Sequence, residues 1–284
     1  MDMRIVPVLL AAAVGLAACG SDSDSTAAGD SLPPVVDGYQ YPTGADDLVI
    51  EYAEVGGFMP RDFAFRQTPN VLISGDGRSF SPGAQIEIYP GPLLPAVQVW
   101  SIGEDGIQDA LAAADDAGLL QEIDYEQPTN IADASTAQVT INVNGETYVH
   151  SAYALGLGGG LGDDGADAAT PERQALLGFI DELTALASPG PTGDPDIFEP
   201  VEYGIEAVAV DDLSAYGTDG IEPTVVDWPD DSTVRLADAA TCSVVSAAEV
   251  GDTLLAANQL TFFTDADVTY QVLAKPMLPG TDCG

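Results

Sequence analysis

Val139-Thr-Ile-Asn-Val-Asn-Gly-Glu-Thr-Tyr-Val-His150 is the stretch of the chain with the strongest structural signal. Two alternating runs flank Asn144-Gly145, a dipeptide that favours the type I′ turn and therefore matches the twist of paired strands. A two-residue turn pairs Val143 with Glu146 and places His150 on the same face of the hairpin. The stretch predicts an antiparallel hairpin, and with it a sheet that is at least partly antiparallel.

The rest of the chain adds further strands and helices around this hairpin. Strands are expected at 48–55, 71–74, 78–80, 84–89, 201–210 and within 235–245, with a C-terminal hairpin at 260–263 and 268–274. Helices are expected at 104–117, at 171–187 and after Ser246; Ser101 with Glu104 and Ser246 with Glu249 form capping boxes, and Thr170 is an N-cap. Their apolar stripes comprise Ile107, Ala110, Leu111 and Ala114 in the first helix, and Leu176, Leu177, Ile180, Leu183 and Ala187 in the second. The pattern predicts an α+β protein in which antiparallel sheets with hairpins are packed by a few helices.

Composition shifts divide the chain into five parts. We expect a signal peptide at 1–18, a lipidated flexible tether at 19–38, an α+β domain at 39–187, a linker at 188–197 and a smaller α+β domain of similar class at 198–284. The tether is rich in Ser and Asp and has no apolar periodicity, which is typical of a solvated segment.

The leader ends in Leu16-Ala-Ala-Cys19, which has the form of a bacterial lipobox. Arg4 precedes an apolar run that ends at Leu16 and is shorter than the ~20 residues of a membrane span, so a signal peptide is expected. In the families that this lipobox resembles, processing supplies a diacylglyceryl group and often a further acyl chain such as palmitate. On Cys19 these chains would anchor the exported protein to the outer face of the cell membrane. The alternative is an ordinary signal peptide cut near Ala18, which would leave a free thiol.

The remaining cysteines, Cys242 and Cys283, form an even pair if Cys19 carries lipid. Such a pair in an exported protein is most simply a disulfide. On the chain-entropy argument, closing this loop would add roughly 4 kcal/mol of stability. The alternative is two unpaired thiols.

The chain holds 46 acidic and 7 basic residues, for a formal net charge of −39. A surface of this kind repels phosphates, whose binding depends on Lys and Arg, so nucleic acid is not an expected partner. The expected partners are the membrane, through the Cys19 lipid, and an envelope protein, a peptide or a cell-wall component.

The residues that could carry chemistry are few, and no cofactor is expected. His150 is the one histidine, and its place on the apolar face of the hairpin favours a structural role over a catalytic one. Asp163, Asp164 and Asp167 are weak candidates for a calcium site, because the EF-hand spacing is not there. Trp100 and Trp228 are expected in the core rather than in a sugar platform. Acidic residues are so abundant that a carboxylate pair for glycoside hydrolysis gives no specific signal.

Several short motifs follow one another along the chain: Gly56-Gly-Phe-Met-Pro60, Gly75-Asp-Gly-Arg78, Tyr89-Pro-Gly-Pro-Leu-Leu-Pro95, Ala152-Tyr-Ala-Leu-Gly156, Trp228-Pro229 and Lys275-Pro-Met-Leu-Pro279 before Cys283. In their order the chain resembles uncharacterised cell-envelope lipoproteins of actinobacterial type. The resemblance implies a lipoprotein and supplies no activity for any residue. The stretch from Tyr89 to Pro95 is interpreted as a rigid connector, with an exposed recognition element as the alternative.

The sequence leaves three functions open. The first is a non-enzymatic cell-envelope protein that binds a partner, which fits the anchor and the missing catalytic set. The second is a carboxylate-dependent hydrolase acting on polysaccharide. The third is an accessory solute-binding lipoprotein.

Overall fold

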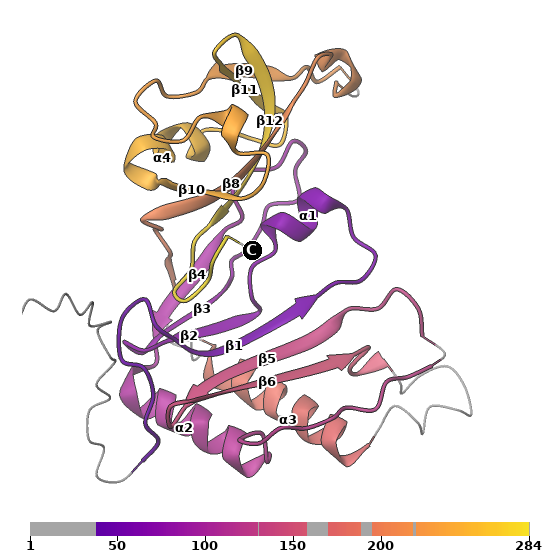
Figure 1. Cartoon of the computed structure of the whole chain (residues 1–284), viewed down its shortest axis with the longest axis vertical. Coiled ribbons are helices and arrows are strands. Elements are labelled where there is room, and N and C mark those ends of the chain that lie inside the picture. Colours follow the sequence, from indigo (N-terminus) through magenta and orange to yellow (C-terminus); the bar gives the residue numbers. More distant parts are fainter. Residues whose placement is uncertain (1–37, 130, 158–169, 189–194, 218–219, 284) are drawn as a thin grey trace, which may run out of the picture. The chain divides into compact units, whose positions relative to one another are not determined.

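The computed structural model describes residues 38–129, 131–157, 170–188, 195–217 and 220–283. These residues belong to one compact unit, Leu32–Gly284. The expected signal peptide, the expected lipidation site Cys19 and almost all of the expected tether lie outside the described residues, as do Asp163, Asp164 and Asp167. The fold is α+β, with two separate sheets, and this confirms the predicted class (Figure 1).

The first sheet has seven strands in the order β6-β5-β1-β2-β3-β4-β7, and every neighbouring pair is antiparallel. Its strands are β1 (Leu48–Val55), β2 (Val71–Ser74), β3 (Arg78–Pro82), β4 (Val97–Ser101), β5 (Thr136–Val143), β6 (Glu146–Tyr153) and β7 (Asp196–Ile197). The short helix α1 (Arg61–Arg66) lies between β1 and β2 in the chain. Four of its six strand pairs join chain neighbours, whereas β5 with β1 and β4 with β7 join strands that are distant in sequence.

The hairpin of β5 and β6 forms in the predicted register. Val143 pairs with Glu146, and Val139 pairs with His150. Asn144 and Gly145 both have positive φ, 54° and 79°, as a type I′ turn requires. The hairpin prediction is confirmed down to the pairing of individual residues.

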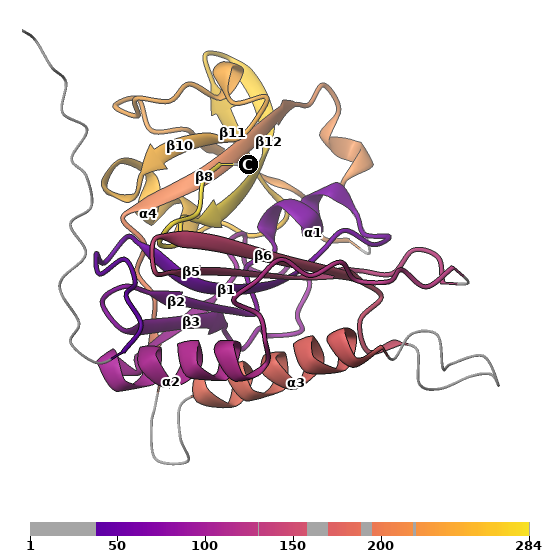
Figure 2. The same cartoon turned by 60° about the horizontal axis from the view of Figure 1, so that its bottom comes forward.

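Two helices cover one face of this sheet, as Figure 2 shows. They are α2 (Gly103–Asp116) and α3 (Pro171–Leu186), which pack against the main core. The predicted N-cap Thr170 is confirmed, because its Oγ1 accepts a hydrogen bond from the Arg173 N–H at 3.4 Å. The first capping box is wrong: Ser101 lies in β4, paired with Arg78, and α2 begins at Gly103. The sequence pattern places Leu177 in the core, but it is 38% exposed, because it falls beside the buried stripe of α3.

The second sheet has five strands in the order β10-β8-β12-β11-β9. Its elements are β8 (Glu202–Ala209), β9 (Thr224–Asp227), β10 (Ser243–Ser246), the helix α4 (Ala247–Leu255), β11 (Thr261–Asp265) and β12 (Val268–Pro276), with 3₁₀ turns at Leu213–Ala215 and Leu236–Asp238. All pairs are antiparallel except β9 with β11, which is parallel. Ser246 caps α4 as predicted, accepting from the Ala248 N–H at 3.2 Å. The other half of the predicted capping box is not formed, because the Glu249 carboxylate accepts from the Thr233 N–H at 2.8 Å.

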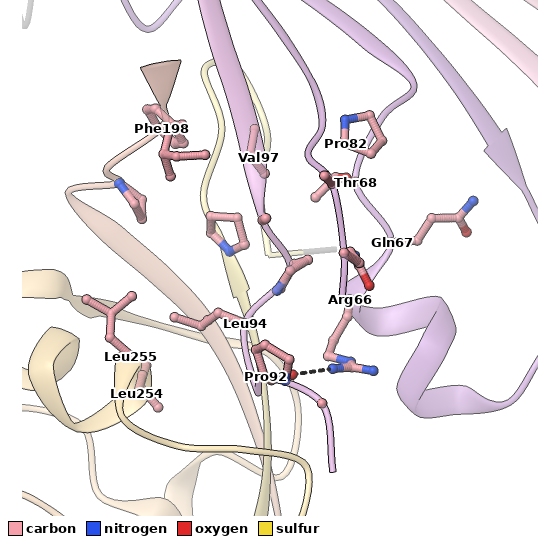
Figure 3. Close-up of a pocket in the computed structure, with 18 of the residues that line it drawn as sticks. Arg66, Gln67, Thr68, Pro82, Pro92, Leu94, Val97, Phe198, Leu254 and Leu255 are labelled. Carbon is pink, nitrogen blue, oxygen red and sulfur yellow. Dashed lines mark hydrogen bonds between the residues drawn. The ribbon is translucent and has the colours of Figure 1, made fainter. Parts of the chain in front are cut away.

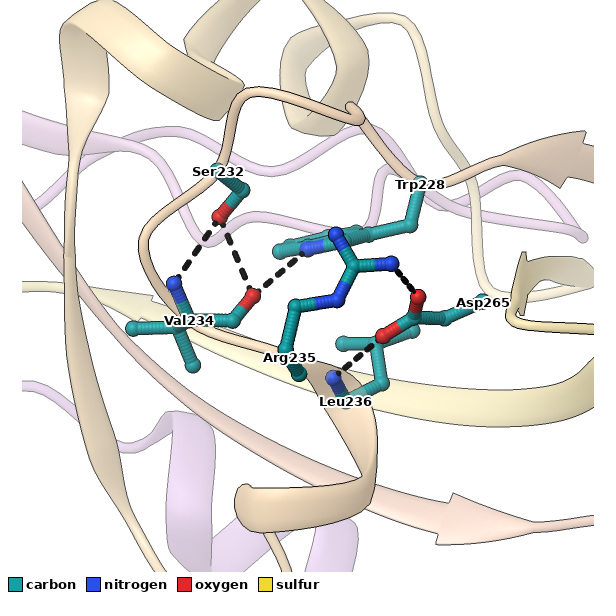
Figure 4. A network of polar contacts seen from close by, with 6 residues as sticks. All are labelled: Trp228, Ser232, Val234, Arg235, Leu236 and Asp265. Carbon is teal, nitrogen blue, oxygen red and sulfur yellow. Dashed lines mark hydrogen bonds and ion pairs between the residues drawn. The ribbon is translucent and has the colours of Figure 1, made fainter.

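The core of the second sheet includes Trp228, which is 2% exposed and stacks edge-on against Phe263. Its indole Nε1–H donates to the Val234 carbonyl at 3.0 Å (Figure 4). Beside it, the buried carboxylate of Asp265 accepts from the Leu236 N–H and pairs with Arg235. The expectation that Trp228 is a core residue is confirmed.

The chain after β12 contacts both sheets. Leu278 packs against Leu72, Phe80 and Val97 on the face of the first sheet away from α2 and α3. Cys283 then bonds to Cys242, with 5.4 Å between the two Cα atoms, so the predicted disulfide is present.

Two connecting segments differ in structure from what the sequence predicts. The predicted strand at 84–89 is wrong: this stretch has no strand partner, and Ile86 and Ile88 are 69% and 58% exposed. Within the expected linker 188–197, residues 188 and 195–197 are described, and β7 there pairs with β4. The domain boundaries themselves stay a prediction.

Candidate functional site

A cavity of about 530 Å³ is the main candidate site of the described residues. This volume lies within the range of about 300–1,000 Å³ that is typical of small-molecule sites. Its wall comes from four stretches that are distant in sequence, 63–70, 82–97, 197–203 and 254–259, together with Pro276. Figure 3 shows Leu254 and Leu255 of α4 on one side of the hollow and Arg66 on the other.

The wall of the cavity is mainly apolar, and large side chains remain exposed at it. Phe63, Ile86, Ile88, Ile197 and Leu255 all line the cavity, and all are more than half exposed. Clustered apolar exposure of this kind marks binding sites more often than it marks ordinary surface. Ile86 and Ile88 thus line a hollow rather than pack against a neighbouring strand.

The cavity wall is depleted of acidic residues. Of 284 residues, 46 are acidic, so an average set of 25 residues would include about four. None of the described lining residues is Asp or Glu, and Arg66 is their one charged side chain. The cavity is therefore an uncharged apolar surface with a single cation, in a protein whose overall charge is strongly negative.

Three contacts position Arg66 at the end of α1. Arg61, at the start of the helix, forms an ion pair with Glu206 of β8 at 2.6 Å. The Lys275 ammonium of β12 lies 5.3 Å from the ring centre of Phe65. Arg66 itself donates from Nη1 to the Leu93 carbonyl at 3.1 Å and to the Pro92 carbonyl at 3.4 Å. Both ends of this short helix are thus attached to neighbouring elements.

The proline-rich stretch from Tyr89 to Pro95 forms part of the cavity wall. The Gly91 N–H donates to the Gln259 side chain at 3.1 Å, and the Gln259 N–H donates to the Gly91 carbonyl at 2.9 Å. The Leu93 N–H donates to the Ala257 carbonyl at 3.1 Å. These bonds fix the stretch against the end of α4, which favours its interpretation as a rigid connector.

His150 is a structural residue of the main core, as expected. It is 1% exposed, and its Nε2–H donates to the Leu119 carbonyl at 2.8 Å. Its Nδ1 is then the acceptor for the Tyr125 hydroxyl at 2.9 Å. Burial lowers the pKa of His150, and the bond to Leu119 opposes that shift only in part. Burial therefore favours the neutral ring, the two hydrogen bonds fix its orientation, and His150 does not line the cavity described above.

The described residues contain no group of three or more potential metal ligands. A second hollow of about 440 Å³ carries Asp76 and Glu104. The Asp76 carboxylate forms an ion pair with Arg78 Nε at 2.7 Å and accepts a hydrogen bond from the Ser74 hydroxyl at 2.6 Å. This hollow therefore offers no comparable binding chemistry.

Arg66 is not predicted as a site residue from the sequence, because it is an isolated arginine in an unpatterned stretch. The one signal that could have pointed to it is the scarcity of cations in this chain.

No helix among the described residues has the length and hydropathy needed to cross a membrane. Comparison of the chain with protein-family models, with curated proteins and with solved structures finds no match.

Proposed function

We propose that the protein is an exported lipoprotein, anchored through Cys19 to the outer face of the cell membrane, that binds a small apolar ligand without chemical conversion. The observation that carries the binding role is the cavity of about 530 Å³ with its exposed apolar wall. It favours the binding module and the accessory solute-binding lipoprotein over the hydrolase, because the described lining offers no carboxylate pair.

The anchor is supported by the lipobox-like Leu16-Ala-Ala-Cys19. Replacing Cys19→Ser removes the thiol that would accept lipid, so we expect the protein to shift from the membrane fraction to the soluble or secreted fraction. Metabolic labelling with a fatty acid should mark the wild type and not the variant. Equal labelling or equal membrane recovery of both proteins would remove the anchor from the proposal.

The binding role predicts that the cavity binds linear alcohols with an affinity that rises with their chain length. Each added methylene of a linear alkanol should tighten binding about fourfold until the cavity is filled, because burying one contributes about 0.8 kcal/mol. Isothermal titration calorimetry of a hexanol-to-decanol series measures this slope. A negative heat-capacity change should accompany it, since apolar surface is buried.

A matched pair of variants locates the binding. Leu255→Gln places an amide at the cavity wall and should weaken decanol binding by about threefold or more. Leu177→Gln makes the same change on α3, outside the cavity, at another exposed leucine, and should leave binding unchanged. Absence of saturable binding, or equal binding by both variants, contradicts the proposed site.

A further inference from the structure

The arginines differ in what their guanidinium groups contact. Arg61, Arg78 and Arg235 each form an ion pair with a carboxylate. Arg66 forms none with any described residue, although acidic residues outnumber basic ones by 46 to 7. Its hydrogen-bond acceptors are neutral backbone carbonyls, so its charge is left without a counterion among the residues that the structure describes.

The guanidinium of Arg66 is also fixed in direction while part of its donor capacity is unused. The bonds from Nη1 to Pro92 and Leu93 hold the group in place. Its Nε is buried and has no acceptor among the described residues. Buried donors are normally satisfied by protein or water, so Arg66 has hydrogen-bonding capacity that the described residues do not use. An arginine with a fixed fork suits a carboxylate, which can accept two parallel N–H bonds.

The charges around the cavity favour one anionic group and no more. The Lys275 ammonium lies over the ring of Phe65, the residue before Arg66, and adds to the positive potential near Arg66. Negative charge is also near. The pKa of the lining residue Tyr203 is raised mainly by burial and, to a smaller extent, by the charge of Glu199. Exposed Glu87 lies between two lining isoleucines. A ligand with several negative charges would meet these carboxylates, whereas a single carboxylate at Arg66 need not.

We propose that the ligand of this cavity is a single-chain carboxylic acid, with its carboxylate at Arg66 and its hydrocarbon chain along the apolar wall. The inference rests on the proposed binding role of the cavity and adds the chemical class of the ligand. Arg66 is then the residue that distinguishes an acid from the neutral alcohol of equal length. The apolar wall supplies the chain-length dependence common to both.

The test compares decanoate with decanol on the full chain carrying Cys19→Ser, at a pH where the acid is ionised. Calorimetry of the wild-type cavity should give decanoate an affinity at least about tenfold above that of decanol, because charge-assisted hydrogen bonds add roughly 1.5–3 kcal/mol. Arg66→Gln should abolish this ratio while decanol binding stays unchanged. Arg66→Lys should keep part of it. Arg78→Gln alters the net charge equally but lies outside the cavity, and should keep all of it.

The outcomes separate the two proposals. Tight decanol binding with an acid-to-alcohol ratio near one, or a ratio that Arg66→Gln leaves intact, overturns the carboxylate inference and leaves the binding role standing. If neither ligand binds, the binding role fails and the inference fails with it. If an Arg66 variant does not fold, the ratio measured on the wild-type cavity decides alone. The leader is common to all the proteins compared, so differences between them arise in the cavity.

Discussion

Replacing both Cys242 and Cys283 by serine is expected to lower the free energy of unfolding by about 4 kcal/mol. The two cysteines are 41 residues apart in the chain, and their bond closes a loop that contains β10, α4, β11 and β12. Without the bond, the unfolded chain regains the freedom of that loop, while the folded chain gains little. The stability difference is therefore set mainly by the unfolded state.

The bond also secures a segment that no helix or strand holds. After β12, the tail places Leu278 against the first sheet, where it is 6% exposed. Gly280 approaches Leu48 so closely that a Cβ on the glycine would lie 2.5 Å from the leucine Cβ. Since Pro276, the last residue of β12 before this tail, lines the cavity, loss of the bond should weaken alkanol binding as well as stability.

Urea denaturation of the oxidised protein and of the double variant, both carrying Cys19→Ser, measures the difference. Dithiothreitol should bring the oxidised protein to the stability of the double variant and leave the double variant unchanged. A difference below about 1 kcal/mol would show that the bond does not constrain the unfolded chain as the loop length demands.

The parts of the fold that the sequence predicts correctly are those whose information is local. The Asn144-Gly145 turn and its alternating flanks specify a hairpin within twelve residues, and its register follows. The same holds for the turn between β2 and β3 and for the N-caps at Thr170 and Ser246. Each of these depends on neighbours within a few positions, so no knowledge of distant contacts is required.

The parts that the sequence does not predict depend on distant partners. The two-residue strand β7 exists because β4 offers an edge, and β9 pairs in parallel with β11 across a long connection. At Ile86 and Ile88 the alternation typical of a strand is present, but the side chains line a cavity instead. Alternation shows that every second residue faces something apolar, and it does not show what that surface is.

The candidate site cannot be predicted from the sequence for the same reason. Its wall joins stretches from residue 63 to residue 276, and among them only Tyr89 to Pro95 suggests a recognition element from its sequence. The proposed role of Arg66 depends on its having no ion pair with a described carboxylate. Only the tertiary arrangement of the described residues shows this. The proposed anchor at Cys19 is the opposite case, because a lipobox-like pattern such as Leu16-Ala-Ala-Cys19 consists of adjacent residues.

Arg173 is the most deeply buried cation of the described residues, at 1% exposure. It lies in the first turn of α3 and donates to three backbone carbonyls: from Nη1 to Glu126 at 3.2 Å, and from Nη2 to Tyr153 at 2.8 Å and Ala154 at 3.1 Å. One side chain thus joins a helix, the end of β6 and the segment that follows α2. Each carbonyl would lack this donor if the guanidinium were removed.

We expect Arg173→Leu to lower the free energy of unfolding by about 3–5 kcal/mol, because buried carbonyls left without a donor cost about 1–3 kcal/mol each. Arg173→Lys should recover only part of this loss, since an ammonium on a flexible stem cannot reproduce a planar fork. Arg61→Leu is the control: Arg61 is exposed, its pair with Glu206 should contribute at most about 1 kcal/mol, and urea denaturation should show that contrast. Equal losses in Arg173→Leu and Arg61→Leu would mean that relaxation or water satisfies the three carbonyls. In that case the guanidinium would fill space in the core without holding the helix to the sheet.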